Sequence, residues 1–202
     1  MRSIWKHACL ATAAFALCCS CAQVGADEGA KAPGPEELMK AMAETGQPGP
    51  EHEKLKALEG NWTYSAKLWM DPSQPAVKTN GTIERRLILG GRFLEEKYNG
   101  EGFDGKPGFE AFALIGYDKA QGKYTMTWAC NMGTGVARGE GTADASGKKL
   151  TFETKSFCPL RKKVIQGRDE FRVEGDKIVA ESYVLEDGKE VKIMESVAVR
   201  QK

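Results

Sequence analysis

The chain has 202 residues, with 29 Lys and Arg against 28 Asp and Glu, and its formal net charge is +1. This length fits one ordinary domain with appendages. The balanced charge argues against a generally basic nucleic-acid-binding protein and against an acidic disordered chain. Hydrophobic residues make up 41% of the chain, which is enough for a core, and the 23 glycines indicate many turns and therefore strands.

Residues 1–26 have the pattern of an export signal, in which a positively charged start precedes a short apolar run. The run is too short to span a bilayer as a stable anchor. Two processing routes stay open. Small residues before Asp27 fit simple cleavage, whereas the stretch ending in Cys21 resembles a lipobox and would place a lipid anchor on that cysteine. Either route predicts an exported protein that is periplasmic, membrane-anchored in the cell envelope, or secreted.

Residues 27–50 are rich in Ala, Gly and Pro, and we expect a flexible tether there. A short helix is predicted from Glu51 to Glu59. Pro50 stands at its start, where a missing backbone N–H is tolerated, and Gly60 ends it.

The body of the chain, residues 51–202, has the alternation of a β-sheet with one solvent-facing side. In the stretch 150–153, for example, Leu and Phe alternate with Thr and Glu. Turn signals recur at nearly even intervals with no helical segment between them, which predicts an up-and-down antiparallel meander. An open sheet would expose its edge strands, so we expect closure. The predicted fold is all-β, a single antiparallel barrel behind a short N-terminal helix.

Four blocks of this body resemble one bacterial family. They are His52 to Trp62, Leu89-Gly90-Gly91-Arg92-Phe93-Leu94, Gly116-Tyr117-Asp118 and Met132-Gly133-Thr134-Gly135. In this order they are similar to the blocks of the family catalogued as domain of unknown function 1579. The resemblance implies a lipocalin-like, calycin-type barrel, and it implies no activity because none is assigned to the family. The chain departs from the family's pattern at Cys130, where Asp is expected.

The Gly60-x-Trp62 pair resembles the Gly-x-Trp signature in the first strand of lipocalins. In that family the Trp fills the closed end of the barrel beneath an Arg from the last strand, and Arg200 is the matching residue. The resemblance therefore implies a cation–π contact between Arg200 and Trp62, with a structural role.

Three charged side chains are predicted to face the interior. A two-residue turn at Gly90-Gly91 places Arg85 opposite Glu96 on the more apolar face of the hairpin. Glu195 shares a face of the last predicted strand with four apolar residues, Val191, Ile193, Val197 and Val199. An inward charge must be paired or neutral, so these groups either contact the polar part of a ligand or balance each other.

Large apolar groups are predicted beside them. Met126 and Trp128 alternate on one face of a strand, and Tyr98 follows Glu96 on the inner face of the hairpin. In a barrel wide enough for a ligand, such core residues also form the pocket wall.

His52 is the only histidine outside residues 1–26, so it cannot form a zinc site alone, and it stands away from any signal for a nucleophile. A haem ligand is a minor hypothesis for it. A polar contact between the helix and the barrel rim is the expected role, and no metal or other cofactor is predicted.

Four of the six cysteines lie in residues 1–26, which leaves Cys130 and Cys158 in the body. In an exported protein such a pair favours a disulfide. The meander puts both at one end of the barrel, two strand spacings or about 9.5 Å apart, so adjoining loops would have to close the gap. Two separate thiols are the alternative.

The sequence thus predicts an exported lipocalin-like barrel that binds or carries a small, largely apolar molecule. Its expected wall is Tyr98, Met126 and Trp128, and its expected polar groups are Arg85, Glu96 and Glu195. Two alternatives stay open. One is an envelope enzyme that uses Glu96 or Glu195 as general acid and base. The other is a structural or partner-binding module whose barrel is filled with side chains.

Overall fold

A computed structural model of the chain describes residues 33–102, 104–159 and 161–202. The predicted export signal, residues 1–26 with Cys21, lies outside the described residues. The chain divides into two compact units, and the second begins at Gln47. In the first unit, α2 (Pro35–Gly46) is a helix within the segment predicted as a tether, and none of its side chains is buried.

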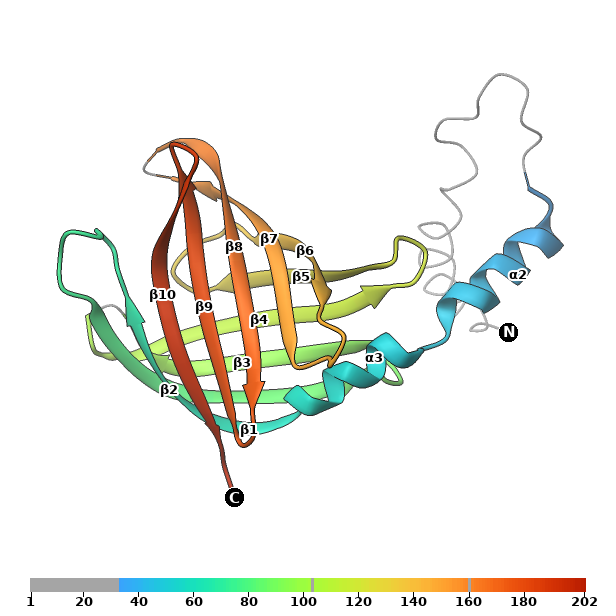
Figure 1. Cartoon of the computed structure of the whole chain (residues 1–202), viewed down its shortest axis with the longest axis horizontal. Coiled ribbons are helices and arrows are strands. Elements are labelled where there is room, and N and C mark those ends of the chain that lie inside the picture. The colour runs from blue at the N-terminus through green and yellow to red at the C-terminus, as the bar shows by residue number, and fades with distance from the viewer. Residues whose placement is uncertain (1–32, 103, 160) are drawn as a thin grey trace, which may run out of the picture. The chain divides into compact units, whose positions relative to one another are not determined.

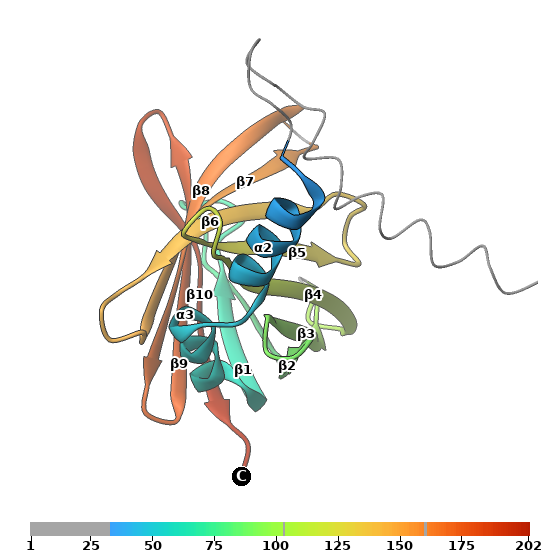
Figure 2. The same ribbon diagram turned by 90° about the vertical axis from the view of Figure 1, so that its right-hand side faces the viewer.

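The second unit is a closed antiparallel β-barrel (Figures 1 and 2). It opens with α3 (Pro50–Lys54) and the 3-10 turn η2 (Leu55–Leu58). The strands are β1 (Gly60–Leu68), β2 (Val77–Ile88), β3 (Phe93–Glu101), β4 (Pro107–Asp118), β5 (Lys123–Cys130), β6 (Ala137–Ala143), β7 (Lys149–Cys158), β8 (Lys163–Glu174), β9 (Lys177–Glu186) and β10 (Lys189–Arg200). Each strand pairs with the next, and β1 pairs with β10. The predicted barrel behind a short helix is confirmed.

The strands form where apolar and polar residues alternate. Along β1, the side chains of Trp62, Tyr64 and Ala66 are buried, whereas those between them are exposed. The β2–β3 hairpin turns at Gly90 and Gly91, whose φ values of 67° and 83° suit residues without a Cβ. This turn sets the register that places Arg85 opposite Glu96, as predicted.

One end of the barrel, where β1 begins, is closed by α3 and η2. Leu55 and Leu58 are buried in the core, and the Trp62 indole N–H donates to the Leu58 carbonyl at 3.0 Å. The Tyr124 hydroxyl on β5 donates to the Glu51 carbonyl at 2.8 Å. The helical segment is therefore attached to β1 and to β5, through apolar packing and through hydrogen bonds.

The predicted contact between Arg200 and Trp62 is confirmed. The two residues are paired across β10 and β1, and the guanidinium carbon lies 4.2 Å from the indole ring centre. The same guanidinium donates to the backbone carbonyls of Ala57 and Glu59. Arg200 therefore joins the last strand, the first strand and η2 at the closed end.

A bulge in β10 reverses the faces predicted for the second half of this strand. The register with β9 shifts between Lys192 and Met194. After the shift, Ala198 is buried at 2% exposure, whereas Val197 and Val199 lie on the outer surface, with Val199 42% exposed. The prediction that Val197 and Val199 face inward is wrong, because one extra residue exchanges the two faces of a strand.

The predicted disulfide is also not formed, because Cys130 and Cys158 are both free cysteines. Cys130 ends β5 and Cys158 ends β7, with β6 between these strands. Two strand spacings of about 4.8 Å exceed the reach of a disulfide. Each thiol instead sits at its own strand end, half-buried.

Candidate functional site

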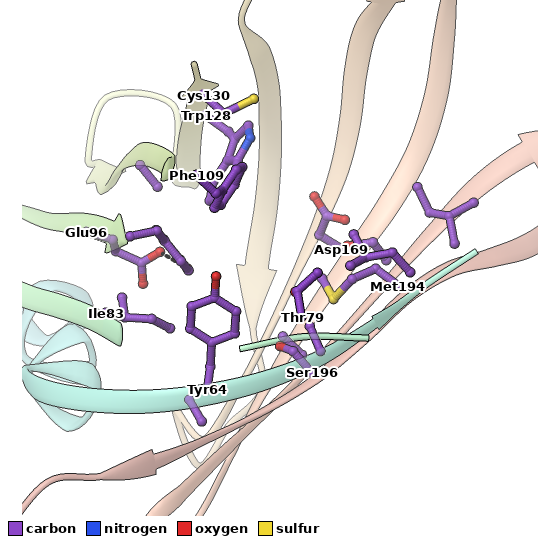
Figure 3. A pocket seen from close by; sticks show the side chains of 18 of the residues that line it. Tyr64, Thr79, Ile83, Glu96, Phe109, Trp128, Cys130, Asp169, Met194 and Ser196 are labelled. Atoms are coloured by element: carbon purple, nitrogen blue, oxygen red, sulfur yellow. Dashed lines mark hydrogen bonds between the residues drawn. The ribbon is translucent and has the colours of Figure 1, made fainter. Parts of the chain in front are cut away.

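The barrel encloses a cavity of about 500 Å³ (Figure 3). This volume lies in the range of small-molecule sites, and a barrel filled with side chains, one of the predicted alternatives, would not contain it. Inward-facing residues of most strands form the wall, and the majority of them are apolar. The cavity extends to the end opposite α3, where Met70 and Met132 from two connecting loops also line it.

Aromatic rings form one side of the cavity. The rings of Tyr98 and Trp128 meet edge to face at 4.9 Å, and those of Tyr64 and Tyr98 at 6.1 Å. Met126 lies on the same face of β5 as Trp128 and lines the cavity too. The structure thus places the predicted wall residues Tyr98, Met126 and Trp128 together, and it adds Tyr64 and Phe109, which the sequence analysis did not select.

Two glycines make room for Tyr64. A Cβ at Gly81 would lie 2.7 Å from its ring, and a Cβ at Gly100 would lie 2.5 Å from its hydroxyl oxygen. Both glycines sit on the inner face of their strands, at paired positions of β2 and β3. The Tyr64 ring therefore crosses bare backbone, which keeps the space above it open for the cavity.

Arg85 and Glu96 form an ion pair on the cavity wall. The Arg85 Nε donates to the carboxylate at 2.6 Å, and each side chain is only 2% exposed. The Tyr98 hydroxyl donates to the other carboxylate oxygen at 2.8 Å. Burial and the adjacent Glu96 charge raise the pKa of Tyr98, so this phenol stays protonated and keeps donating. The two charges therefore balance each other, one of the two predicted outcomes.

One donor of this group is left over. Within the part of the chain that the structure describes, Arg85 Nη1 is the one buried side-chain nitrogen or oxygen atom that has no hydrogen-bond partner. Its guanidinium carbon lies 5.6 Å from the ring centre of Trp62, so the group sits toward the closed end of the barrel. A buried donor without an acceptor is costly.

Asp169 lines the cavity from β8, across from Glu96 (Figure 3). Burial raises the pKa of its carboxyl group, against the lowering effect of a hydrogen bond from Ser182. The sequence analysis did not select Asp169. The sequence does contain a pattern that could have identified it. Asp169 stands two residues before Phe171 in the stretch 163–174, so in a strand the two side chains lie on the same face, and both line the cavity.

Comparison with known protein families shows which family the barrel belongs to. Residues 47–200 match the family model described as a protein of unknown function, DUF1579. The chain belongs to this family. A search of the curated proteins finds no match. Among the described residues of this DUF1579 member, no helix is both long enough and apolar enough to cross a membrane.

Glu195 does not belong to the cavity of this DUF1579 barrel. It follows the β10 bulge and lies on the outer surface, where Lys67 donates to it at 2.7 Å. This hydrogen bond is the main reason that the pKa of Glu195 is lowered. The prediction that Glu195 faces inward is wrong, because the bulge moves it to the other side of the strand.

His52 is buried where α3 meets the barrel and is not part of the cavity wall. Its Nδ1 accepts a hydrogen bond from the Gly49 N–H at 3.1 Å, and its ring meets Tyr117 edge to face at 5.8 Å. Burial, followed by the nearby Lys119 charge, lowers its pKa. The Gly49 hydrogen bond thus stays within the helical segment, and the ring contact with Tyr117 joins His52 to the barrel.

Proposed function

We propose that this barrel binds a small, largely apolar molecule inside its cavity and carries it outside the cytoplasm. The observation that supports this most directly is a cavity of about 500 Å³ with a mainly apolar wall in an otherwise packed barrel. Protein interiors are normally packed without spaces of this size, and an empty apolar cavity lowers stability. A ligand that fills it gains the apolar burial that the side chains leave unused.

The rival proposal of an envelope enzyme has less support. Glu96 is held by Arg85 and Tyr98 on both carboxylate oxygens, so it is poorly placed to take a proton from a substrate. Glu195 lies on the outer surface, bound by Lys67. The two carboxylates named for that chemistry therefore lack a free position on the cavity.

Export belongs to the same proposal and rests on the sequence alone. Residues 1–26 would direct the chain through the membrane, after which cleavage before Asp27 or lipid attachment at Cys21 would complete it. The intact mass of protein recovered from the envelope fraction distinguishes these routes, since lipidation adds mass to a chain that begins at Cys21. A full-length chain recovered from the cytoplasm contradicts export.

Binding is tested with N-phenyl-1-naphthylamine, a neutral dye that fluoresces in apolar surroundings. We expect saturable binding to the purified chain and displacement by whatever native mass spectrometry finds bound after purification. The matched variants are Ala66→Phe, which points into the cavity, and Ser65→Phe, which points to solvent from the next position. The first should weaken dye binding about tenfold or more, and the second should leave it within twofold.

The proposal fails if the wild-type chain neither binds the dye nor retains a small molecule. It also fails if Ser65→Phe and Ala66→Phe weaken binding equally, because the dye would then sit on the surface. Thermal melts of both variants check that each is folded before its binding is compared.

A further inference from the structure

We infer that the cavity selects a neutral molecule whose carbonyl oxygen accepts a hydrogen bond from Arg85 Nη1, and that it selects against carboxylates of the same size. This inference rests on the proposed function and names the chemistry of the ligand. It is carried by the unpaired donor of Arg85 together with the charges that surround the cavity.

The first step concerns the donor. Arg85 Nη1 is buried and unpartnered, and Arg85 lines the cavity. Its Nε is engaged by Glu96, so the free donor has a fixed position on a side chain that is held in place. A carbonyl oxygen entering the cavity completes the hydrogen bonding of this guanidinium, which an alkane cannot do.

The second step concerns charge. Among the described residues that line the cavity, Arg85 is the only basic one, and the acidic ones are Glu96, Glu101 and Asp169. The Arg85 charge is already compensated by Glu96 at 2.6 Å. A carboxylate ligand would therefore place a second negative charge beside Arg85, whose positive charge Glu96 already balances. It would lose its hydration without gaining a new counter-charge.

The third step concerns cationic ligands. Glu96 accepts from Arg85 and Tyr98, and Glu101 accepts from the Asn80 backbone N–H at 3.0 Å. Burial raises the pKa of Asp169, which favours its neutral form. The carboxylates are thus engaged or inclined to hold a proton, whereas the Arg85 donor is free, so a neutral acceptor fits this wall better than an amine.

The rest of the ligand is placed by the apolar wall. From Arg85 the cavity continues past Tyr98 and Trp128 and reaches Phe109 and Met132 near the open end. A ketone, ester or amide with an aliphatic or aromatic tail can leave its carbonyl at Arg85 and cover the tail with these side chains.

The test measures displacement of N-phenyl-1-naphthylamine from the full chain at pH 8 by four probes of similar length: undecane, 2-undecanone, decanoate and decylamine. We expect 2-undecanone to bind about tenfold or more tightly than undecane, because it gains a hydrogen bond to a charged donor. Decanoate and decylamine should bind more weakly than the ketone by a similar factor.

Two variants move this preference in different directions. Glu96→Gln keeps the size of the side chain and leaves Arg85 as an uncompensated cation, so the affinity for decanoate relative to the ketone should rise about tenfold or more. The double variant Arg85→Met/Glu96→Leu removes the polar group as a pair, and the ketone should lose its advantage over undecane. The control is Lys67→Met/Glu195→Leu, which removes an ion pair from the outer surface and should leave the order of probes unchanged.

The inference is overturned if undecane and 2-undecanone bind the wild-type chain equally, or if decanoate or decylamine binds it more tightly than the ketone. The dye itself still binds in those cases, so the proposed function survives. Loss of dye binding by the wild type overturns both. The wild-type probe series decides the matter even if a variant does not fold.

Discussion

Trp62 connects the closed end of the barrel to the floor of its cavity. Its ring contacts the guanidinium of Arg200 at 4.2 Å, its N–H is bound to Leu58, and the ion-paired Arg85 lies 5.6 Å from the ring centre. One side chain therefore touches η2, the last strand and the polar group of the cavity. A change at Trp62 should be felt at all three places, since buried neighbours do not respond independently.

Replacing Trp62 tests this role. Trp62→Ala should lower the free energy of unfolding by about 3–5 kcal/mol, because it leaves a large cavity in a packed region. Urea denaturation followed by far-UV circular dichroism measures the change. Trp69→Ala serves as the control, since Trp69 is only partly buried, in the β1–β2 connection. Equal losses for the two variants would contradict a special role for Trp62.

Gly100 is a second position where a single atom matters. In Gly100→Ala, the new Cβ would lie 2.5 Å from the Tyr64 hydroxyl and 2.6 Å from the Asn80 carbonyl, so the strands must move. We expect a loss of about 1–3 kcal/mol in the free energy of unfolding and weaker dye binding, because Tyr64 is pushed into the cavity. Gly135→Ala, where a Cβ meets nothing within 4 Å, should change neither quantity. A stable Gly100→Ala variant with unchanged binding would refute the account of Tyr64.

At the scale of strands, the outer surfaces of β8, β9 and β10 are joined by charges. Glu181 on β9 accepts from Arg172 on β8 at 2.8 Å and from Lys192 on β10. The hydrogen bonds from Lys192 and Arg172 lower the pKa of Glu181 to about 2. This carboxylate therefore links three neighbouring strands on the side of the barrel that carries the bulge.

The lowered pKa of Glu181 gives stability a pH dependence. Its contribution is fully present above pH 4.5, the ordinary value for this group, and is lost as the pH falls toward 2. Glu181→Gln should thus cost on the order of 1–3 kcal/mol at pH 7 and progressively less below pH 4. Urea unfolding at pH 7, 5, 4 and 3 measures the difference, and the exposed Glu153→Gln should show no such trend. A constant difference across this range would contradict the role of the carboxylate.

Prediction from the sequence succeeds for the β2–β3 hairpin and fails for the inner face of β10. Alternation and turn residues are local, so they predicted the barrel and the pairing of Arg85 with Glu96. In β10 the stronger apolar pattern, with Val197 and Val199, belongs to the outer surface, while Ala198 faces inward. Small residues such as Ala198 fit the crowded end of the barrel near Trp62. They face inward because of the bulge, which no local sequence pattern predicts.

The cavity is harder to predict because it depends on the whole set of inward side chains. The sequence predicts a wall made of Tyr98, Met126 and Trp128. The space beside this wall stays open because small residues, among them Gly81 and Gly100, leave it unfilled. The unpaired nitrogen of Arg85 is likewise a property of the folded barrel. Sequence patterns assign faces to strands, whereas volumes and leftover donors require the three-dimensional structure.

At the scale of the whole barrel, the pairing of β1 with β10 places the first and last strands of the domain side by side. Gln201 donates to the Asn61 carbonyl at 2.8 Å, directly beside the contact of Arg200 with Trp62. Closure thus joins residues separated by nearly the full length of the domain, and this non-local pairing should make folding slow. The first strand has only β2 as a partner until the last strand is in place.

Circular permutation tests this closure. Joining Lys202 to Gln47 through a flexible linker of about ten residues and opening the chain between Gly90 and Gly91 keeps every strand pair. We expect the permuted chain to have the far-UV circular dichroism spectrum and the dye affinity of the original, with a lower free energy of unfolding. Opening it instead between Tyr64 and Ser65, inside β1, should prevent folding. Failure of the first permutant to fold would contradict this account, in which the pairing of β1 with β10 closes the barrel whatever the order of the strands in the chain.

Because neighbouring strands run in opposite directions, every connection that follows an odd-numbered strand lies at the open end of the barrel. The loops that carry Met70 and Met132 are two of these connections. The closed end, with Trp62, Arg200 and η2, is built from other parts of the chain. The barrel is therefore a natural frame for redesign. Residues of the loops at 69–76 and 131–136 can be randomised in a library to change which molecules enter, while the frame that holds Arg85 and Glu96 in place is left untouched.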